Sequence, residues 1–159
     1  GRVIAADLSK VEEANNVIDF TLENYGRIDI LVHAASVGWS WSHVSEDSMN
    51  DIATTPPDKW HEVVGINLNA CYYMSHGVLQ HMLRAGSGSI VNVASISGMV
   101  GMKNAHTYCA AKGGVINLTR SMAATYGKSG VRTNCVCPGY TDTPMIADDS
   151  VSNKRTKTS

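Results

Sequence analysis

Short apolar runs alternate along this chain with longer stretches whose apolar residues recur at helical spacing. Runs typical of buried strands lie at 3–6, 28–34, 89–94 and 131–136. The helical pattern covers about 10–25, 57–85 and 109–126. Strands that alternate with helices predict parallel strands joined by right-handed crossovers. We therefore expect an α/β fold with a three-layer, doubly wound parallel sheet.

Local signals mark where these helices begin and end. Ser9 and Glu12 have the spacing of a capping box, and Gly26 follows the last apolar position of that helix. Pro57 suits the first turn of the long helix that follows. Asn67 lies inside that helix, where asparagine is unfavourable, which indicates a local hydrogen-bonding task.

Several polar or small residues come directly after predicted strands. Asp7, Ala34, Ser95 and the pair Pro138-Gly139 each follow one of the apolar runs. In parallel sheets, ligands bind at the carboxyl ends of the strands. We expect these residues to line one edge of the sheet.

Tyr108 and Lys112 lie one turn apart on the same face of the last predicted helix. A tyrosine hydroxyl ordinarily titrates near ~10, and a nearby ammonium would lower its pKa by favouring the phenolate. Ser95, at a strand end, could donate a hydrogen bond to a substrate oxygen while Tyr108 exchanges a proton with it. The set suits interconversion of an alcohol and a carbonyl, which needs a hydride carrier.

The spacing Ser-x12-Tyr-x3-Lys resembles the catalytic signature of the short-chain dehydrogenase/reductase family, whose members include 3-oxoacyl reductases and alcohol dehydrogenases. The resemblance implies a Rossmann-like domain, NAD or NADP as cofactor, and Ser95, Tyr108, Lys112 and Asn67 as catalytic residues. It implies that Asn67 kinks its helix and holds a water linked to the lysine. The implied cofactor contacts are Asp7, Leu8, Ala34, Tyr108, Lys112, Pro138, Gly139, Thr141 and Thr143.

The chain departs from the family pattern after the second predicted strand. His33-Ala34-Ala35-Ser36 stands where the family has Asn-Asn-Ala-Gly. We expect His33 to cap the strand end as a polar residue, not to act as a ligand or base. The long loop 37–57 contains Trp39 and Trp41, which could either roof a flat or apolar substrate or anchor the loop to the surface.

The glycine-rich turn that binds a dinucleotide's pyrophosphate between a strand and a helix does not occur in this sequence. The matches begin at what resembles the family's third strand. We therefore expect residues 1–150 to be a partial NAD(P)-binding domain and 151–159 to be a loose polar tail. A fragment of this kind should by itself bind dinucleotide poorly and be inactive.

Composition and charge limit the kinds of molecule that this chain is expected to bind. The 159 residues carry a net charge of −1 and no basic patch that would suit nucleic acid. No apolar run approaches the ~20 residues of a membrane helix. The four cysteines lack metal-ligand spacing, so we expect no metal, reduced thiols and a cytoplasmic protein. The expected partners are a small alcohol or ketone and further copies of the chain in a dimer or tetramer, since the long apolar helices resemble the family's interface helices.

Two other functions are open at this point. A non-catalytic domain of the same fold could bind a cofactor or a partner, although it would not need the whole Ser, Tyr, Lys and Asn set. A serine hydrolase using Ser95 is disfavoured, because a nucleophile elbow has glycine two residues to either side and this chain has Val93 and Ser97.

Overall fold

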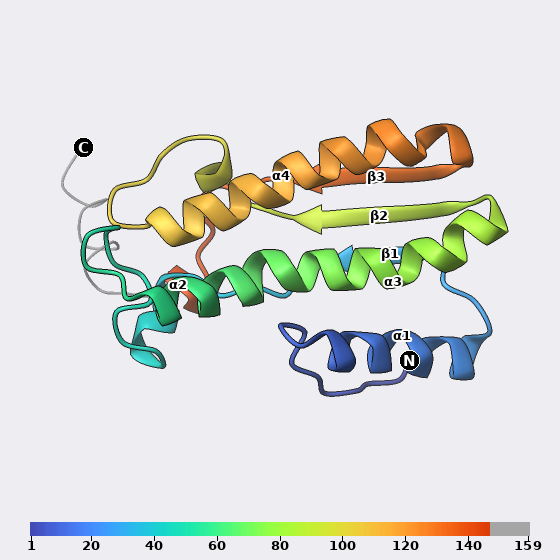
Figure 1. Ribbon diagram of the computed structural model, residues 1–159, viewed down its shortest axis with the longest axis horizontal. Helices are drawn as coiled ribbons and strands as arrows, with labels where there is room; N and C mark the ends of the chain where they lie inside the picture. Colours follow the sequence, from blue (N-terminus) through green and yellow to red (C-terminus); the bar gives the residue numbers. More distant parts are fainter. Residues whose placement is uncertain (147–159) are drawn as a thin grey trace.

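The computed structural model describes residues 1–146 of the chain. Three parallel strands form one sheet in the order β1 (Ile30–His33), β2 (Gly88–Val93) and β3 (Val131–Val136). Their arrows point the same way in Figure 1, toward the end of the molecule that carries α2 (Pro57–Val64). The strands predicted at these three places are confirmed, whereas the predicted tail at 151–159 lies outside the described residues.

Three helices cover one face of the sheet. They are α1 (Val11–Tyr25), α3 (Ala70–Ala85) and α4 (His106–Tyr126). In Figure 1 they run side by side: α1 packs on α3, α3 lies against β1 and β2, and α4 lies against β2 and β3. The described residues therefore contain a parallel sheet and one helical layer. The Rossmann-like class is confirmed as a partial fold.

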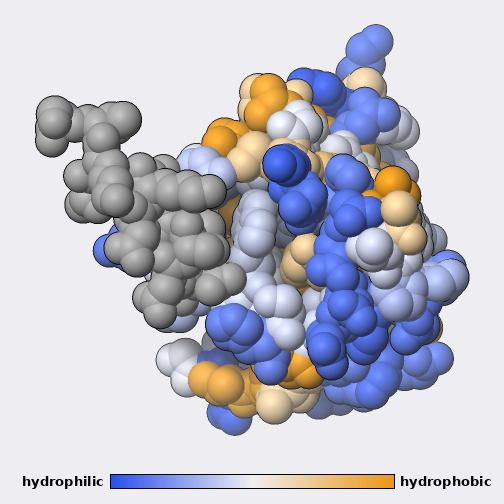
Figure 2. Space-filling model, turned by 90° about the vertical axis from the view of Figure 1, so that its left-hand side faces the viewer, coloured by the Kyte–Doolittle hydropathy of each residue, from blue (hydrophilic) through white to orange (hydrophobic). Residues whose placement is uncertain are grey.

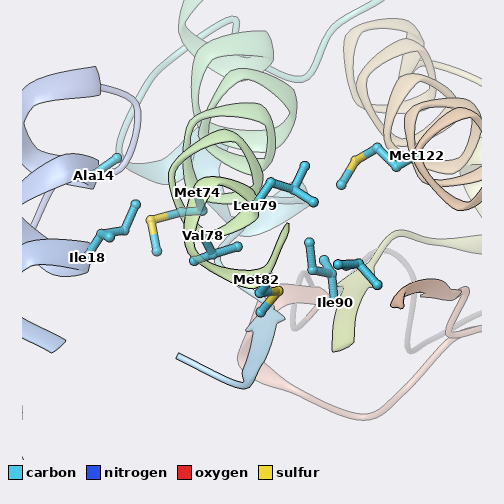
Figure 3. Close-up of a cluster of buried hydrophobic side chains, with 9 residues drawn as sticks. Ala14, Ile18, Met74, Val78, Leu79, Met82, Ile90 and Met122 are labelled. Atoms are coloured by element: carbon cyan, nitrogen blue, oxygen red, sulfur yellow. The ribbon is translucent and has the colours of Figure 1, made fainter. Parts of the chain in front are cut away.

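The main core lies between this helical layer and the sheet (Figure 3). It joins α1, α3 and α4 to β2 and β3 through buried side chains from each element: Ala14, Ile18, Met74, Val78, Leu79, Met82, Ile90, Met122 and Val131. Burying one large aliphatic side chain stabilises a fold by about 1.5–3 kcal/mol. This cluster therefore fixes the strands whose carboxyl ends carry the site.

The two faces of the sheet are packed very differently. We call "covered face" the side that meets the helices, with Leu31, His33, Ile90, Asn92, Val131 and Thr133. The "open face" carries the apolar Ile30, Val32, Val91, Val93 and Val136 together with the polar Ser89, Arg132 and Asn134. Ile30 is 66% exposed and Val32 60% exposed, and no strand within residues 1–146 pairs with the outer edge of β1. Within residues 1–146, this face is therefore uncovered and the outer edge of β1 is exposed.

The first residues differ from the prediction. Residues 3–6 form no strand, and Val3 is exposed, because no strand in the described part of the chain lies beside this run. The predicted capping box is also wrong. Ser9 donates its hydroxyl to Asp7 Oδ1 over 2.6 Å, so it does not cap the helix. Glu13, and not Glu12, reaches back to accept the N–H of Asp7 over 2.6 Å.

The long helix expected over 57–85 is present, but it is not regular. A π-helical turn, Gly65–Asn69, separates α2 from α3. Asn67 lies in this turn, where the helix was expected to kink. Within residues 1–146, no helix is both long and apolar enough to cross a membrane.

Candidate active site

A cavity of about 290 Å³ opens where the strands end. Figure 2 looks onto this end of the molecule, on which hydrophilic and hydrophobic residues both gather. Many of the residues that the sequence predicted for the site line the cavity: Ala34, Ser95, Tyr108, Pro138, Gly139, Thr141 and Thr143. They follow three different strands, so the parallel sheet brings them together as expected.

Ser95 comes directly after β2 and begins a short 3-10 turn, Ile96–Gly98. Its Oγ accepts the N–H of Ser97 over 3.1 Å, which leaves the hydroxyl proton free to be donated elsewhere. The turn packs against α4 at Lys112. A Cβ on Gly98 would lie 2.6 Å from the carbonyl carbon of Lys112, so only glycine allows this close approach.

Tyr108 lies in the first turns of α4 and is buried beside the cavity. Burial raises the pKa of its hydroxyl above the usual value, and a hydrogen bond with the Ser95 side chain acts in the opposite direction. The sequence predicted a pKa lowered by Lys112. That prediction is wrong for this structure, because the cost of burying the phenolate dominates.

Lys112 follows one helical turn after Tyr108 and is only 1% exposed. Its Nζ donates to the carbonyl oxygen of Val93 over 3.0 Å and lies 5.7 Å from the centre of the Tyr108 ring. Burial lowers the pKa of this ammonium to about 8. Lys112 therefore remains mostly protonated at neutral pH and holds a positive charge behind the tyrosine.

Asn67 is buried in the π-helical turn, and its Oδ1 accepts the N–H of Val37 over 3.1 Å. This bond ties the loop after β1 to the long helix. Its Nδ2 has no partner among the described residues. The hydrogen-bonding task expected for an asparagine inside a helix is thus visible.

His33 ends β1 and lies beside Asn92 of β2. Burial and the positive charge of Lys112 lower the pKa of the imidazole to about 4. The ring is therefore neutral near pH 7. The ring lies at a strand end as expected, but its buried Nε2 has no hydrogen-bond partner among the described residues.

Three of the predicted cofactor residues do not line the cavity: Lys112, which is buried behind Tyr108, and Asp7 and Leu8, which lie before α1. Asp7 Oδ1 accepts from Ser9, and Asp7 also forms an exposed ion pair with Lys10 at 3.3 Å. Leu8 packs against the main core. Neither residue lines the cavity, because the segment before α1 is held by these local contacts.

The comparison with known families agrees with this geometry. The family model described as short chain dehydrogenase matches residues 2–154. The chain belongs to the short-chain dehydrogenase family.

Relatives within this family share the matched region. Cis-4-hydroxycyclohexanecarboxylate dehydrogenase from Sinomonas cyclohexanicum is 40% identical over 91% of this chain and 55% of its own length. Meso-2,3-butanediol dehydrogenase from Serratia marcescens is 38% identical over 91% of this chain and 55% of its own length. The crystal structure of levodione reductase aligns with a TM-score of 0.81 and 34% identity, over 97% of this chain and 55% of that one. The chain spans about half the length of the relatives it matches.

The sequence did not single out several residues that line the cavity. Tyr140 and Met145 follow β3, and Ile96 and Ser97 belong to the turn after Ser95. In this member of the short-chain dehydrogenase family, they come from irregular segments without a periodic pattern. Trp39 also lines the cavity, whereas for the two tryptophans the sequence left roof and anchor as equal alternatives.

Proposed function

We propose that this chain carries the catalytic residues of an NAD(P)-dependent oxidoreductase that interconverts a secondary alcohol and a ketone by hydride transfer. The supporting observation is the meeting of Ser95 and Tyr108 at one cavity, with the Lys112 ammonium one turn behind the tyrosine. Relatives named as alcohol or diol dehydrogenases support the same class of reaction.

The proposed chemistry begins with the substrate oxygen between two hydroxyl groups. Ser95 donates its hydroxyl proton to this oxygen instead of to Tyr108, since Ser97 already occupies a lone pair of its Oγ. Tyr108 gives a proton to the oxygen during ketone reduction and takes one from it during alcohol oxidation. Burial keeps Tyr108 in the phenol form, which suits proton donation to a ketone.

Lys112 and Asn67 have supporting roles in this proposal. The Lys112 charge, 5.7 Å from the Tyr108 ring, favours the phenolate that forms once the proton has left. Asn67 holds the loop after β1 through Val37 and supports proton exchange behind the lysine. Its unpartnered Nδ2 is a buried donor that could bond a water in such a chain.

The cavity suits the nicotinamide end of NAD or NADP. Its lining includes Ala34 and Ser36 after β1, and Pro138, Thr141 and Thr143 after β3, so a flat ring would meet uncharged walls. Threonine hydroxyls are suitable partners for a carboxamide. When bound, the cofactor exchanges a hydride with the carbon that bears the substrate oxygen.

The phosphate end of the cofactor is a different case. Among residues 1–146, no glycine-rich turn leads from a strand into a helix, which is how such folds usually bind pyrophosphate. The relatives extend well beyond the matched region. We therefore propose that the 159 residues alone bind dinucleotide weakly, and that turnover needs a segment that supplies this turn.

We further propose that copies of the chain associate through α3 and α4, and that the protein works in the reducing cytosol. On α3, Tyr72 is 51% exposed and its ring lies 5.5 Å from that of Tyr73, which gives an aromatic surface for a partner. All four cysteines are free thiols. Sedimentation velocity of the purified chain, with Tyr72→Ser as the variant, tests the association.

The decisive experiment joins this chain to the remaining segments of cis-4-hydroxycyclohexanecarboxylate dehydrogenase and follows reduced nicotinamide across a panel of secondary alcohols and ketones. We expect Tyr108→Phe to lower turnover by about 100-fold or more while cofactor binding is kept. Tyr72→Phe, an exposed tyrosine on α3, is the matched control.

Unchanged turnover in Tyr108→Phe would contradict the role of the tyrosine. Absence of any cofactor-dependent absorbance change across the whole panel would favour the non-catalytic binding domain instead. Measurable turnover by the isolated 159-residue chain would contradict the proposed need for a separate phosphate-binding segment.

A further inference from the structure

Two loops from different strands meet over the cavity. The 3-10 turn Trp39–His43 follows β1, and the turn Pro144–Ile146 follows β3. A Cβ on Gly38 would lie 2.7 Å from Met145 Cγ, so the methionine side chain occupies the space above this glycine. Trp39 and Met145 therefore form two adjoining walls of one cavity.

The two tryptophans of the first loop have separate tasks. The Trp39 ring lies 5.1 Å from the Tyr108 ring, at 54°, so the indole adjoins the residue that we propose to exchange the proton. Trp41 instead donates its Nε1 to Glu62 over 2.9 Å, and Glu62 also accepts from Ser45. Trp41 thus anchors the loop, whereas Trp39 faces the cavity.

The walls of the cavity combine hydroxyl groups with a larger apolar surface. None of the described residues that line it carries a charge. Its hydroxyl groups include those of Ser95 and Tyr108, while Trp39, Ile96 and Met145 supply apolar surface. An anionic group entering this space would lose its hydration without gaining a cation from these walls.

We infer that the cavity selects a neutral secondary alcohol or ketone with an apolar ring next to the reacting carbon, and that Trp39 and Met145 determine this specificity. A ring offers a broad, rigid face to an indole edge and to a thioether, and both contacts are favourable. The inference rests on the proposed function only for the identity of the reacting oxygen. The apolar contacts with the ring depend only on the residues that line the cavity, and not on hydride transfer.

Binding to the 159-residue chain tests the walls without requiring hydride transfer. Saturation-transfer NMR would compare 1-phenylethanol with 2-butanol, which lacks the ring, and with mandelate, which adds a carboxylate. We expect 1-phenylethanol to bind at least about tenfold more tightly than either. A hydrophobic pocket discriminates by this order against 2-butanol, which lacks the ring. Mandelate should bind less tightly because its carboxylate would lose hydration without gaining a cation. Trp39→Ala should remove most of this preference.

Met145→Ala provides a second variant on a different loop and should weaken binding of 1-phenylethanol in the same direction. Tyr25→Ala is the matched control, and it should leave the preference unchanged, since Tyr25 is an exposed aromatic residue on α1 that does not line the cavity. Equal binding of the three probes, binding of none of them, or a preference that survives both Trp39→Ala and Met145→Ala would overturn the inference.

The outcome is separable from that of the proposed function. We call "completed enzyme" this chain joined to the remaining segments of cis-4-hydroxycyclohexanecarboxylate dehydrogenase. If the chain binds the ring selectively but the completed enzyme is inactive, the inference holds and the hydride-transfer proposal is wrong. An active completed enzyme combined with unselective binding would do the reverse.

Discussion

The covered and open faces of the sheet have similar strand residues but opposite surroundings. On the covered face, Ile90 is fully buried between the strands and α3, whereas Ile30 on the open face is 66% exposed. Ile30 and Val32 have the β-branched, apolar character of a strand buried on both sides. The sequence of β1 thus suits burial on both faces, but only one face is packed within residues 1–146.

This difference in packing between the two faces determines which of them supports the site. His33 and Asn92 lie on the covered face near its carboxyl end, and Lys112 reaches this region from α4. The proposed catalytic residues are therefore supported by the helical layer on the covered face. The open face adds little to their support, so changes on the two faces should have very different effects.

The largest contrast is expected from the same substitution on both faces. Ile90→Ala should lower the free energy of unfolding by about 2–5 kcal/mol, because it leaves a cavity in the main core. Ile30→Ala, on the neighbouring strand, should cost less than about 1 kcal/mol, since the side chain is already largely in water. Urea denaturation followed by circular dichroism measures both, and equal losses would refute the contrast between the faces.

Alkaline titration tests the buried charge at the carboxyl end. The pKa of Lys112 falls from its ordinary value of 10.5 to about 8 in the folded chain. The unfolded chain therefore binds more protons between these values, and stability should rise with pH. Relative to Lys112→Met, we expect a gain of about 3 kcal/mol between about pH 7 and 10.5.

The control for this titration is the exposed Lys103, and Lys103→Met should retain the pH-dependent gain. Denaturation curves at a series of pH values give the difference directly. A gain that persists in Lys112→Met would show that another group is responsible.

Acid titration tests His33 in the opposite range. The pKa of this imidazole falls from 6.5 to about 4 on folding, so the unfolded chain binds more protons in that interval. Its contribution to stability is complete above pH 6.5 and is lost as the pH falls toward 4. We expect His33→Asn to lose about 2 kcal/mol less than the unmodified chain on going to pH 5.

His61 offers the matched control, because it is an exposed histidine on α2. His61→Asn should lose stability in acid just as the unmodified chain does. If His33→Asn also follows the unmodified chain, the covered face does not hold a neutral imidazole at this position.

The smallest effect on stability is expected on the open face. Val32→Thr keeps the shape of the side chain at a position that is 60% exposed, so it should change the free energy of unfolding by less than about 0.5 kcal/mol. It should nevertheless reduce self-association, because Ile30 and Val32 are neighbouring apolar side chains exposed on the edge strand β1. Light scattering measures this, and Val131→Thr, the same change at a fully buried strand position, should instead destabilise the fold.

Much of the fold could be predicted, because the strands and helices carry strong periodic patterns and tertiary packing agrees with them. Three strands, the main helices and the meeting of Ser95 with Tyr108 follow from spacing and from the geometry of parallel sheets. The run 3–6 was misassigned because a strand needs a neighbour, and a local pattern does not reveal whether one exists. The capping box failed because Asp7 competes for Ser9.

The remaining errors concern surroundings that a sequence does not encode locally. The pKa of Tyr108 depends on how deeply α4 is buried, and this depends on contacts from several segments. Met145 reaches the cavity only because two irregular loops cross over it. Trp39 and Trp41 have the same side chain and neighbouring positions, and only the structure assigns one to the cavity and the other to Glu62.

In the turn Gly65–Asn69, the number of residues matters as well as their identity. A π-helical turn holds one residue more than an α-helical turn. Deleting a single residue there would leave a fully bonded, regular α-helix whose flanking segments keep nearly the same rotation about the axis, but it would remove the widened turn that carries Asn67. Asn67 would then no longer meet Val37, and the loop that positions Trp39 would be released from its attachment.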